Sequence, residues 1–317
     1  MRFVPALFLF AMSTVTDIEW SERQPMPRAQ AGGATGYLDG DVVVAGGTTW
    51  IGDVKTWLSD VQIYNPASNT WRSGPKLPAL MAYGPFVSSA TELEIFGGSD
   101  GQTARRDSWK LDTAKTKWVR TGSIPADALL GRAARVSESV FLFGGCRDVV
   151  DLTTCSDAVW RRKENREWQH VATIPGGSLA LAAAAVSGSA VYLFGGCSMD
   201  ADGKVVNHAR ALRYDSTSNQ WNTLKALPSG NRGVTAVAYG DRSILLFGGY
   251  TDSGFTSEVL LYDIQSDTYK RLKPMHLGLA GIEFVSNGHA IYGAGGEDRM
   301  RSRSARFLEG KLTVTER

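Results

Sequence analysis

The chain has 317 residues and a formal net charge of +2, with basic and acidic residues spread along its whole length. This balance lacks the long basic stripe that non-specific nucleic-acid binding requires, so we expect no nucleic-acid partner. The 35 glycines, together with few runs of helix-forming residues, favour an all-β globular protein built from strands and turns.

The first residues have the layout of a short export signal. Arg2 is followed by the apolar run 3–12 and then by small polar residues up to Thr16. We therefore predict a signal segment at 1–16 and export to the periplasm or the extracellular space. The apolar run is too short to span a bilayer as a helix, so we expect no membrane span. The alternative is a buried first strand, in which case the protein is cytoplasmic.

A short apolar run that ends in Gly-Gly recurs six times along the chain. Its second glycines are Gly47, Gly98, Gly145, Gly196, Gly249 and Gly296, at intervals of 47–53 residues. A period near 50 residues is that of kelch repeats, each of which forms one blade of a β-propeller. The glycines allow a turn with positive φ and a close approach of neighbouring backbones.

An aromatic residue keeps the same period. It follows each of the first five Gly-Gly pairs by 20–25 residues, at Trp71, Trp118, Trp168, Trp221 and Tyr269. Turn-forming residues precede it, which indicates a hairpin, and its ring is expected to fill the space between adjacent sheets. We therefore predict four strands per unit and a single six-bladed propeller over 17–317.

The ends of the chain predict how the ring closes. Trp20 lies 51 residues before Trp71 and belongs to the same aromatic series, although no Gly-Gly unit precedes it. We predict that the N-terminal strand around Trp20 joins the C-terminal blade, because this closure removes free sheet edges. A rival closure with Lys311–Thr315 as the outer strand stays open.

The cysteines and histidines predict no metal centre. In an exported protein, Cys146 and Cys155 would close one loop as a disulfide and leave Cys197 odd. Neither the cysteines nor the four dispersed histidines match a zinc-site spacing, and the sequence contains no phosphate-binding glycine loop and no nucleophile elbow. We therefore expect no metal and no cofactor.

Two sets of loops are predicted to meet on one face of the propeller, around the central channel. The loops after the Gly-Gly pairs begin at Thr48, Ser99, Cys146, Cys197, Tyr250 and Glu297, and the loops that lead into the blades carry Arg28, Tyr83, Arg132, Arg232 and the stretch around Leu277. Such a concave, mixed surface predicts a ligand site. Its arginines suit a carboxylate or a phosphate, or alternatively pair with loop carboxylates.

The segments AGGATGYLDGDVVVAGGTTW and LEIFGGSDG narrow the function. With them, the chain resembles the bacterial N-acetylneuraminate epimerases (sialic-acid mutarotases), in particular their cyclically permuted branch. The resemblance runs in order over nearly the whole chain and is specific in the first hundred and the last forty residues. Two departures leave the identity of the sugar open: the loop TTWIGDVKTW is shorter than the family's insert, and the sixth blade's loop carries extra arginines.

The resemblance implies a catalytic pair. The family's pattern of Gly-Gly-Glu with an arginine six residues later matches Gly295-Gly296-Glu297 and Arg303. Independently of the resemblance, Glu297 is the only carboxylate that directly follows a Gly-Gly pair. We predict an isomerase that interconverts the anomers of sialic acid or a related acidic sugar. In this reaction Glu297 is the general base, a water or polar group is the acid, and Arg303 anchors the substrate carboxylate.

Four weaker candidates are predicted to line the pocket: Arg301, Arg232, Arg132 and Tyr83. Two other functions fit the same repeats. A non-catalytic kelch propeller would bind a glycan, a protein partner or a second copy of the chain, and a pure scaffold would bind no small molecule. Only the enzyme would lose its function when Glu297 is replaced by glutamine.

Overall fold

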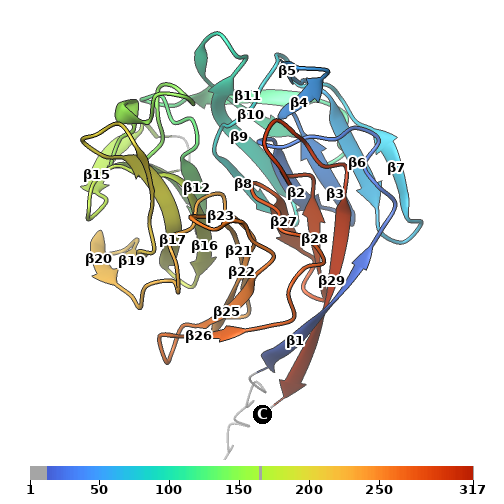
Figure 1. Cartoon of the computed structure of the whole chain (residues 1–317). Coiled ribbons are helices and arrows are strands. Elements are labelled where there is room, and N and C mark those ends of the chain that lie inside the picture. The colour runs from blue at the N-terminus through green and yellow to red at the C-terminus, as the bar shows by residue number, and fades with distance from the viewer. Residues whose placement is uncertain (1–12, 164–165, 317) are drawn as a thin grey trace, which may run out of the picture.

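The computed structural model describes residues 13–163 and 166–316. These residues form six antiparallel sheets arranged radially around one axis, each with four strands and the fourth with one short extra strand (Figure 1). In each blade the inner strand starts at the upper face, which we define as the face that carries the loops after the Gly-Gly pairs, and runs toward the lower face. The predicted all-β, six-bladed propeller is confirmed.

From the inner to the outer strand, the blades are β2 (Ala34–Leu38), β3 (Asp41–Ala45), β6 (Val61–Asn65) and β7 (Thr70–Ser73); β8 (Phe86–Ser89), β9 (Glu92–Ser99), β10 (Ala104–Leu111) and β11 (Trp118–Ser123); β12 (Arg132–Val136), β13 (Ser139–Phe143), β14 (Ala158–Lys163) and β15 (Gln169–Thr173); β16 (Ala180–Ser187), β17 (Ala190–Met199), β19 (Ala211–Asp215) and β20 (Gln220–Thr223); β21 (Thr235–Tyr239), β22 (Ser243–Phe247), β25 (Val259–Asp263) and β26 (Thr268–Arg271); β27 (Glu283–Ser286), β28 (Ala290–Ala294), β29 (Phe307–Glu316) and β1 (Ser13–Glu22).

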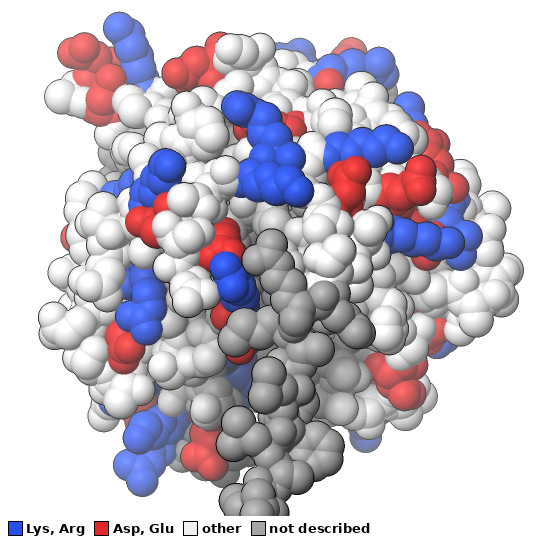
Figure 2. Space-filling view, turned by 90° about the horizontal axis from the view of Figure 1, so that it is seen from below, with Lys and Arg blue, Asp and Glu red and all other residues white. Residues whose placement is uncertain are grey.

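The upper-face loops carry short elements of their own. These are the hairpin of β4 (Thr48–Ile51) and β5 (Val54–Trp57), strand β18 (Val205–Asn207), the hairpin of β23 (Tyr250–Thr251) and β24 (Gly254–Phe255), and the 3-10 helix η1 (Leu152–Thr154). Within the two described ranges, no helix is long and apolar enough to cross a membrane. On the face shown in Figure 2, basic and acidic side chains alternate in small groups.

The N-terminal strand closes the ring as predicted. β1 is the outermost strand of the sixth blade and pairs with β29, with Trp20 opposite Gly310 (Figure 1). The Trp20 ring packs 5.9 Å from Phe247 and 5.8 Å from Phe284 between centroids. The rival closure, with Lys311–Thr315 outermost, is wrong because β29 lies between β28 and β1. Most of the predicted signal segment, residues 1–12, lies outside the described residues, and its last four residues begin β1.

One hydrophobic cluster of described residues fills each of the six spaces between adjacent blades. Between the first and sixth blades, for example, the buried Tyr64 ring lies 4.4 Å from Phe307, and Trp71 lies 4.9 Å from Phe307. The indole N–H of Trp71 donates to the carbonyl of Gln24 at 2.8 Å, which ties the ring to the segment that follows β1. The periodic aromatics therefore join adjacent blades, as the sequence predicts.

The first glycine of a Gly-Gly pair lies where the next blade's backbone comes closest. At Gly46, with φ of 67°, a Cβ would lie 2.3 Å from the carbonyl oxygen of Met81. At Gly295, with φ of 72°, a Cβ would lie 2.1 Å from the carbonyl oxygen of Gln30. That same carbonyl accepts a hydrogen bond from the N–H of Gly296 at 3.0 Å. Only glycine fits both the backbone angle and this gap. We call this close contact of the Gly-Gly pair with the next blade's backbone the Gly-Gly lock. It fixes the position of the residue directly after the pair, which in the sixth blade is Glu297.

Candidate functional site

Six positions directly after the Gly-Gly pairs occupy equivalent places around the upper mouth of the channel. Each pairs with a residue just before the inner strand of its own blade or, in the fourth blade, with the first residue of that strand, and in the sixth blade Glu297 bridges Ala280. The Glu297 N–H donates to the Ala280 carbonyl at 2.8 Å, and the Ala280 N–H donates back at 2.9 Å. Because this bridge and the Gly-Gly lock fix the backbone of Glu297, its carboxylate has a defined position at the mouth.

A second ring of six residues, each next to one of those bridge partners, borders the channel. Five backbone hydrogen bonds of 2.7–2.9 Å join them in sequence, and all six have positive φ. The members are Gly32, Tyr83, Leu130, Leu181, Gly233 and Gly281. The three glycines belong to the first, fifth and sixth blades, and the ring of Tyr83 lies over the first of them, Gly32.

The upper mouth holds a cavity of about 230 Å³. Its lining includes Glu297, Tyr83, Arg232 and Arg132, which are four of the six predicted site residues. Because these residues come from four different blades, the ring closure brings together positions that are far apart in the sequence. The cavity is small, concave and mixed in polarity, which is typical of a small-molecule site.

Arg303 is buried behind the cavity and holds Glu297. Its side chain is 4% exposed, and its Nη1 forms an ion pair and hydrogen bond with Oε1 of Glu297, whose side chain is 32% exposed. Its Nε and Nη2 donate to Oγ1 of Thr48 at 3.1 and 2.9 Å, and Nη2 also donates to Oη of Tyr83 at 3.2 Å. The guanidinium is therefore engaged by protein groups.

This geometry does not fit the prediction that Arg303 anchors a substrate carboxylate. Its donors are consumed by Glu297, Thr48, Tyr83 and the carbonyl of Ser302, and it does not line the cavity. The sequence spacing placed the arginine beside Glu297 correctly. It could not indicate that the guanidinium points at protein groups rather than into the cavity.

Burial raises the pKa of the Glu297 carboxyl above its ordinary value of 4.5, and the positive charges of Arg303, Lys55 and Arg232 act in the opposite direction. Desolvation therefore makes Glu297 a stronger base than an exposed glutamate, while the three cations keep its ionised form accessible. A carboxyl whose pKa is raised by burial beside opposing positive charges is a candidate acid or base of an active site.

Arg232 is the cationic side chain that faces the cavity from the fifth blade. Its guanidinium lies 4.4 Å from the centroid of the Tyr250 ring, and its Nη1 donates to Oδ1 of Asn207 at 2.7 Å. Asn207 is held in turn by Asp252, to which its Nδ2 donates at 2.8 Å. Stacking and one neutral hydrogen bond orient the fork, and the described residues leave its remaining side-chain N–H groups available to an anion.

The floor of the cavity is an ion pair that crosses the channel. Nη1 of Arg132, at the start of β12, lies 3.0 Å from Oε1 of Glu283, at the start of β27. Below this pair the channel widens into a second cavity of about 460 Å³, also lined by both residues. Arg132 therefore follows the alternative in which an arginine pairs with a carboxylate. Sequence reasoning missed Glu283, although aligning the inner strands of the third and sixth blades would have placed the two charges opposite each other.

Two predicted arginines lie away from the cavity. Arg301 is exposed on the loop between β28 and β29 and does not line the cavity. Arg28 forms an ion pair with Asp60, at 3.3 Å between Nε and Oδ2. Thr48, by contrast, gains a role that the sequence did not suggest, because its hydroxyl links Arg303 to Tyr83. Among the described residues, no group of three or more His, Cys, Asp or Glu is placed to hold a metal ion.

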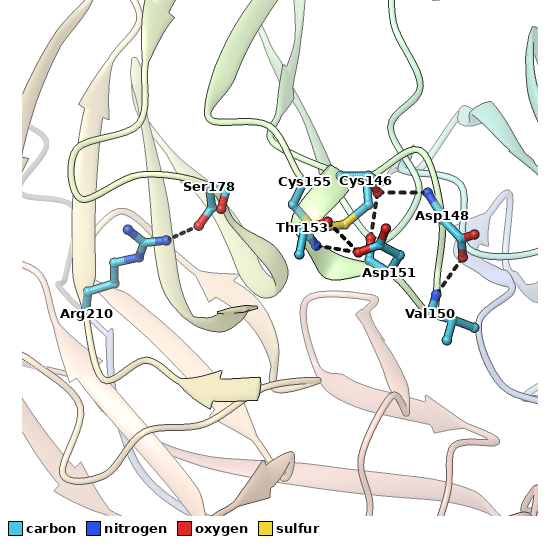
Figure 3. The surroundings of a disulfide bond; sticks show 9 residues. Cys146, Asp148, Val150, Asp151, Thr153, Cys155, Ser178 and Arg210 are labelled. Atoms are coloured by element: carbon cyan, nitrogen blue, oxygen red, sulfur yellow. Dashed lines mark hydrogen bonds between the residues drawn. A yellow bond between two sulfur atoms is a disulfide. The ribbon is translucent and has the colours of Figure 1, made fainter. Parts of the chain in front are cut away.

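A disulfide joins Cys146 to Cys155 on the third blade, as the spacing suggests (Figure 3). It closes a loop that contains η1, whose first turn is capped by the Asp151 carboxylate accepting from the N–H of Thr153 at 3.0 Å. Within the described chain, Cys197 is buried and keeps a free thiol, and burial raises its pKa to about 11. Cys197 is therefore a packing residue rather than a reactive thiol.

Comparison with known proteins gives the family of the fold. A family model described as KLHDC2/KLHL20/DRC7 Kelch-repeats domain matches residues 131–309, and a Kelch motif matches residues 31–78. Kelch-like protein 25 of Xenopus tropicalis is 26% identical over 216 residues, which cover 66% of this chain and 35% of that protein.

N-acetylneuraminate epimerases are also similar. The Vibrio cholerae protein is 32% identical over 175 residues, covering 51% of this chain and 43% of that protein. The Haemophilus influenzae protein is 25% identical over 183 residues, covering 47% of this chain and 49% of that protein. In all three comparisons the chain spans less than half the length of the relative.

Proposed function

Since the chain belongs to the Kelch-repeats family described as KLHDC2/KLHL20/DRC7, a fold that supports enzymes and binding modules alike, we propose that it is a mutarotase acting on sialic acid or a related acidic sugar. The observation that carries this proposal is the Glu297–Arg303 pair, which presents a partly exposed carboxylate of raised pKa in the cavity at the upper mouth. The similarity to N-acetylneuraminate epimerases, named for that sugar acid, supports the choice of substrate.

The proposed reaction exchanges one anomer for the other through the open-chain keto acid. Glu297 accepts the proton of the anomeric hydroxyl, the bond between the anomeric carbon and the ring oxygen breaks, and the ring oxygen takes up a proton. Rotation about the neighbouring carbon–carbon bond then exposes the other face of the ketone. Reversal of the two proton transfers closes the ring as the other anomer.

Arg232 is the proposed anchor of the substrate carboxylate, in the role that the sequence assigned to Arg303. It lines the cavity, and its fork is stacked on Tyr250 rather than paired with a carboxylate. Replacing Arg232 by glutamine should raise KM about ten- to a hundredfold, because a hydrogen bond to a charged group contributes about 1.5–3 kcal/mol. An unchanged KM would remove Arg232 from this role.

The function is tested by dissolving one pure anomer with the full chain and following interconversion by NMR. Wild-type protein should accelerate it well above the buffer rate, and Glu297→Gln should lose about 100-fold or more. Glu258→Gln is a matched control, since Glu258 lies in the fifth blade and pairs with the exposed Arg271. A wild-type rate equal to that of the buffer would refute the enzyme.

A non-catalytic binding module is the second candidate, favoured by apolar side chains exposed around the upper mouth. Ile51 is 62% exposed, Met300 74% and Val150 82%, all on loops that follow Gly-Gly pairs. Such tips suit a macromolecular partner. This candidate predicts that the protein retains a glycan or protein ligand without turnover and that Glu297→Gln changes nothing.

An exported location is proposed as well, because disulfides such as Cys146–Cys155 persist in oxidising compartments. Thiol trapping of protein taken directly from its own cells tests this. Trapping that labels Cys146 and Cys155 in the native protein would contradict it.

A further inference from the structure

Opening the ring of a sugar acid needs a proton donor for the ring oxygen as well as a base for the anomeric hydroxyl. We propose that the hydroxyl of Tyr83 is this donor, which makes Tyr83 the second catalytic residue. The inference rests on the proposed mutarotase function and deepens it by naming the acid that works beside Glu297.

The backbone of Tyr83 fixes its ring at the cavity. Tyr83 has φ of 64°, a conformation that a non-glycine residue keeps only where its surroundings impose it. Here the Tyr83 N–H donates to the Gly32 carbonyl at 2.7 Å, and the Tyr83 carbonyl accepts from the N–H of Leu130 at 2.9 Å. A Cβ at Gly32 would lie 2.5 Å from Cε1 of Tyr83, so the neighbouring glycine makes room for the ring.

Counting donors and acceptors leaves the hydroxyl hydrogen of Tyr83 free. Oγ1 of Thr48 already accepts from Nε and Nη2 of Arg303, which uses both of its lone pairs. The one hydrogen of the Thr48 hydroxyl has two acceptors within reach, Tyr83 Oη at 3.0 Å and the Ala31 carbonyl at 3.4 Å. We assign it to the shorter contact, so that Thr48 donates to Tyr83. With Nη2 of Arg303 also donating to Tyr83 Oη at 3.2 Å, that oxygen accepts two bonds. Among the described residues its own O–H has no acceptor left, and the ring lines the cavity.

One guanidinium thus places the base and the acid side by side. Nη1 of Arg303 holds Glu297, and Nη2 holds Tyr83. The anomeric hydroxyl and the ring oxygen are bonded to the same carbon, so the two proton transfers must also occur side by side. The two bonds that Tyr83 accepts stabilise the negative charge that develops on its oxygen as the proton leaves.

The proton balance closes without a further reactant. In the opening step Glu297 gains the anomeric proton, the carbon–oxygen ring bond breaks, and Tyr83 gives its proton to the ring oxygen, which becomes an alcohol. In the closing step that alcohol attacks the ketone and returns its proton to Tyr83, while Glu297 protonates the carbonyl oxygen. Base and acid are both restored.

The other polar groups that line the cavity are less suited to this role. Arginines are not deprotonated in proteins, and Arg132 is already bound to Glu283 across the channel. The Tyr250 ring stacks against the guanidinium of Arg232 and orients that side chain. Tyr83 is the hydroxyl that the Arg303 fork holds next to Glu297.

The test compares the natural sugar acid with an analogue in which sulfur replaces the ring oxygen. A thiol ionises near pH 8.5, far more readily than an alcohol, so a ring sulfur leaves without a proton donor. Tyr83→Phe should slow interconversion of the oxygen sugar by about 100-fold or more and should leave the sulfur analogue close to the wild-type rate. Glu297→Gln should slow both sugars. Tyr37→Phe, which removes a hydroxyl from the lower cavity, is the matched control.

The outcomes separate the two proposals. An inactive wild-type protein overturns both the mutarotase and the role of Tyr83. An active wild type with a fully active Tyr83→Phe overturns only the role of Tyr83. Equal losses on the oxygen and sulfur sugars would show that Tyr83 merely supports the site, which also overturns it. Retained turnover of the sulfur analogue shows in the same experiment that the variant is folded.

Discussion

Replacing Gly295 by alanine should break the backbone contact between the sixth and first blades and lower the free energy of unfolding. The residue has φ of 72°, which costs an alanine about 1–2 kcal/mol. Its new Cβ would lie 2.1 Å from the carbonyl oxygen of Gln30, so the two backbones must separate. The hydrogen bond from Gly296 to that carbonyl, 3.0 Å long, would then be lost, at about 1–3 kcal/mol. The expected loss in free energy of unfolding is about 2–5 kcal/mol.

Urea unfolding of the two alanine variants Gly295→Ala and Gly288→Ala measures this loss. Gly288 lies in the same blade with φ of 88°, but a Cβ there meets no atom within 4 Å. Gly288→Ala should therefore lower the free energy of unfolding by only the backbone conformational penalty of about 1–2 kcal/mol. Gly295→Ala should also lose sugar interconversion, because Glu297 is two residues away. If the two variants were equally stable, the close approach to the Gln30 carbonyl would not be the reason that Gly295 must be glycine.

Three further predictions concern Glu297, the disulfide and Cys197. Activity should rise with pH as Glu297 loses its proton, with a midpoint above 4.5 because burial raises the pKa of Glu297. Arg303→Gln should move that midpoint higher, because it removes the main opposing charge. A pH–rate profile that is the same for the variant and the wild type would contradict this. Replacing Cys146 and Cys155 by serine should lower the free energy of unfolding by about 2–3 kcal/mol, measured in urea against wild type with and without reductant. Cys197 should stay unreactive toward thiol reagents until the protein unfolds, because burial raises its pKa to about 11.

The fold could be predicted from the sequence because its determinants are local and repeated. Each repeated Gly-Gly pair marks a backbone contact that only glycine allows, and each aromatic residue of the periodic series marks the space between two adjacent sheets. Trp20 revealed the closure because it continues the same series. These signals depend on residue type and spacing alone, which a single sequence contains.

The site could be predicted only in part, because its geometry depends on how distant blades face each other. Glu297 was identifiable as the one carboxylate after a Gly-Gly pair. The pairing of Arg132 with Glu283, 151 residues apart, was not, because it crosses the channel. The direction of the Arg303 guanidinium was hidden as well, since it depends on Thr48 from another blade.

The pairing of β1 with β29 also fixes on which face of the propeller a group joined at Ser13 or Glu316 lies. Because β29 runs downward and β1 runs upward, Ser13 and Glu316 are paired at the lower edge of the sixth blade, on the side away from Glu297. A tag or surface tether joined at either point therefore leaves the upper mouth facing solution. Immobilised protein should bind and turn over small ligands as freely as protein in solution, which makes the chain convenient for surface-based binding measurements.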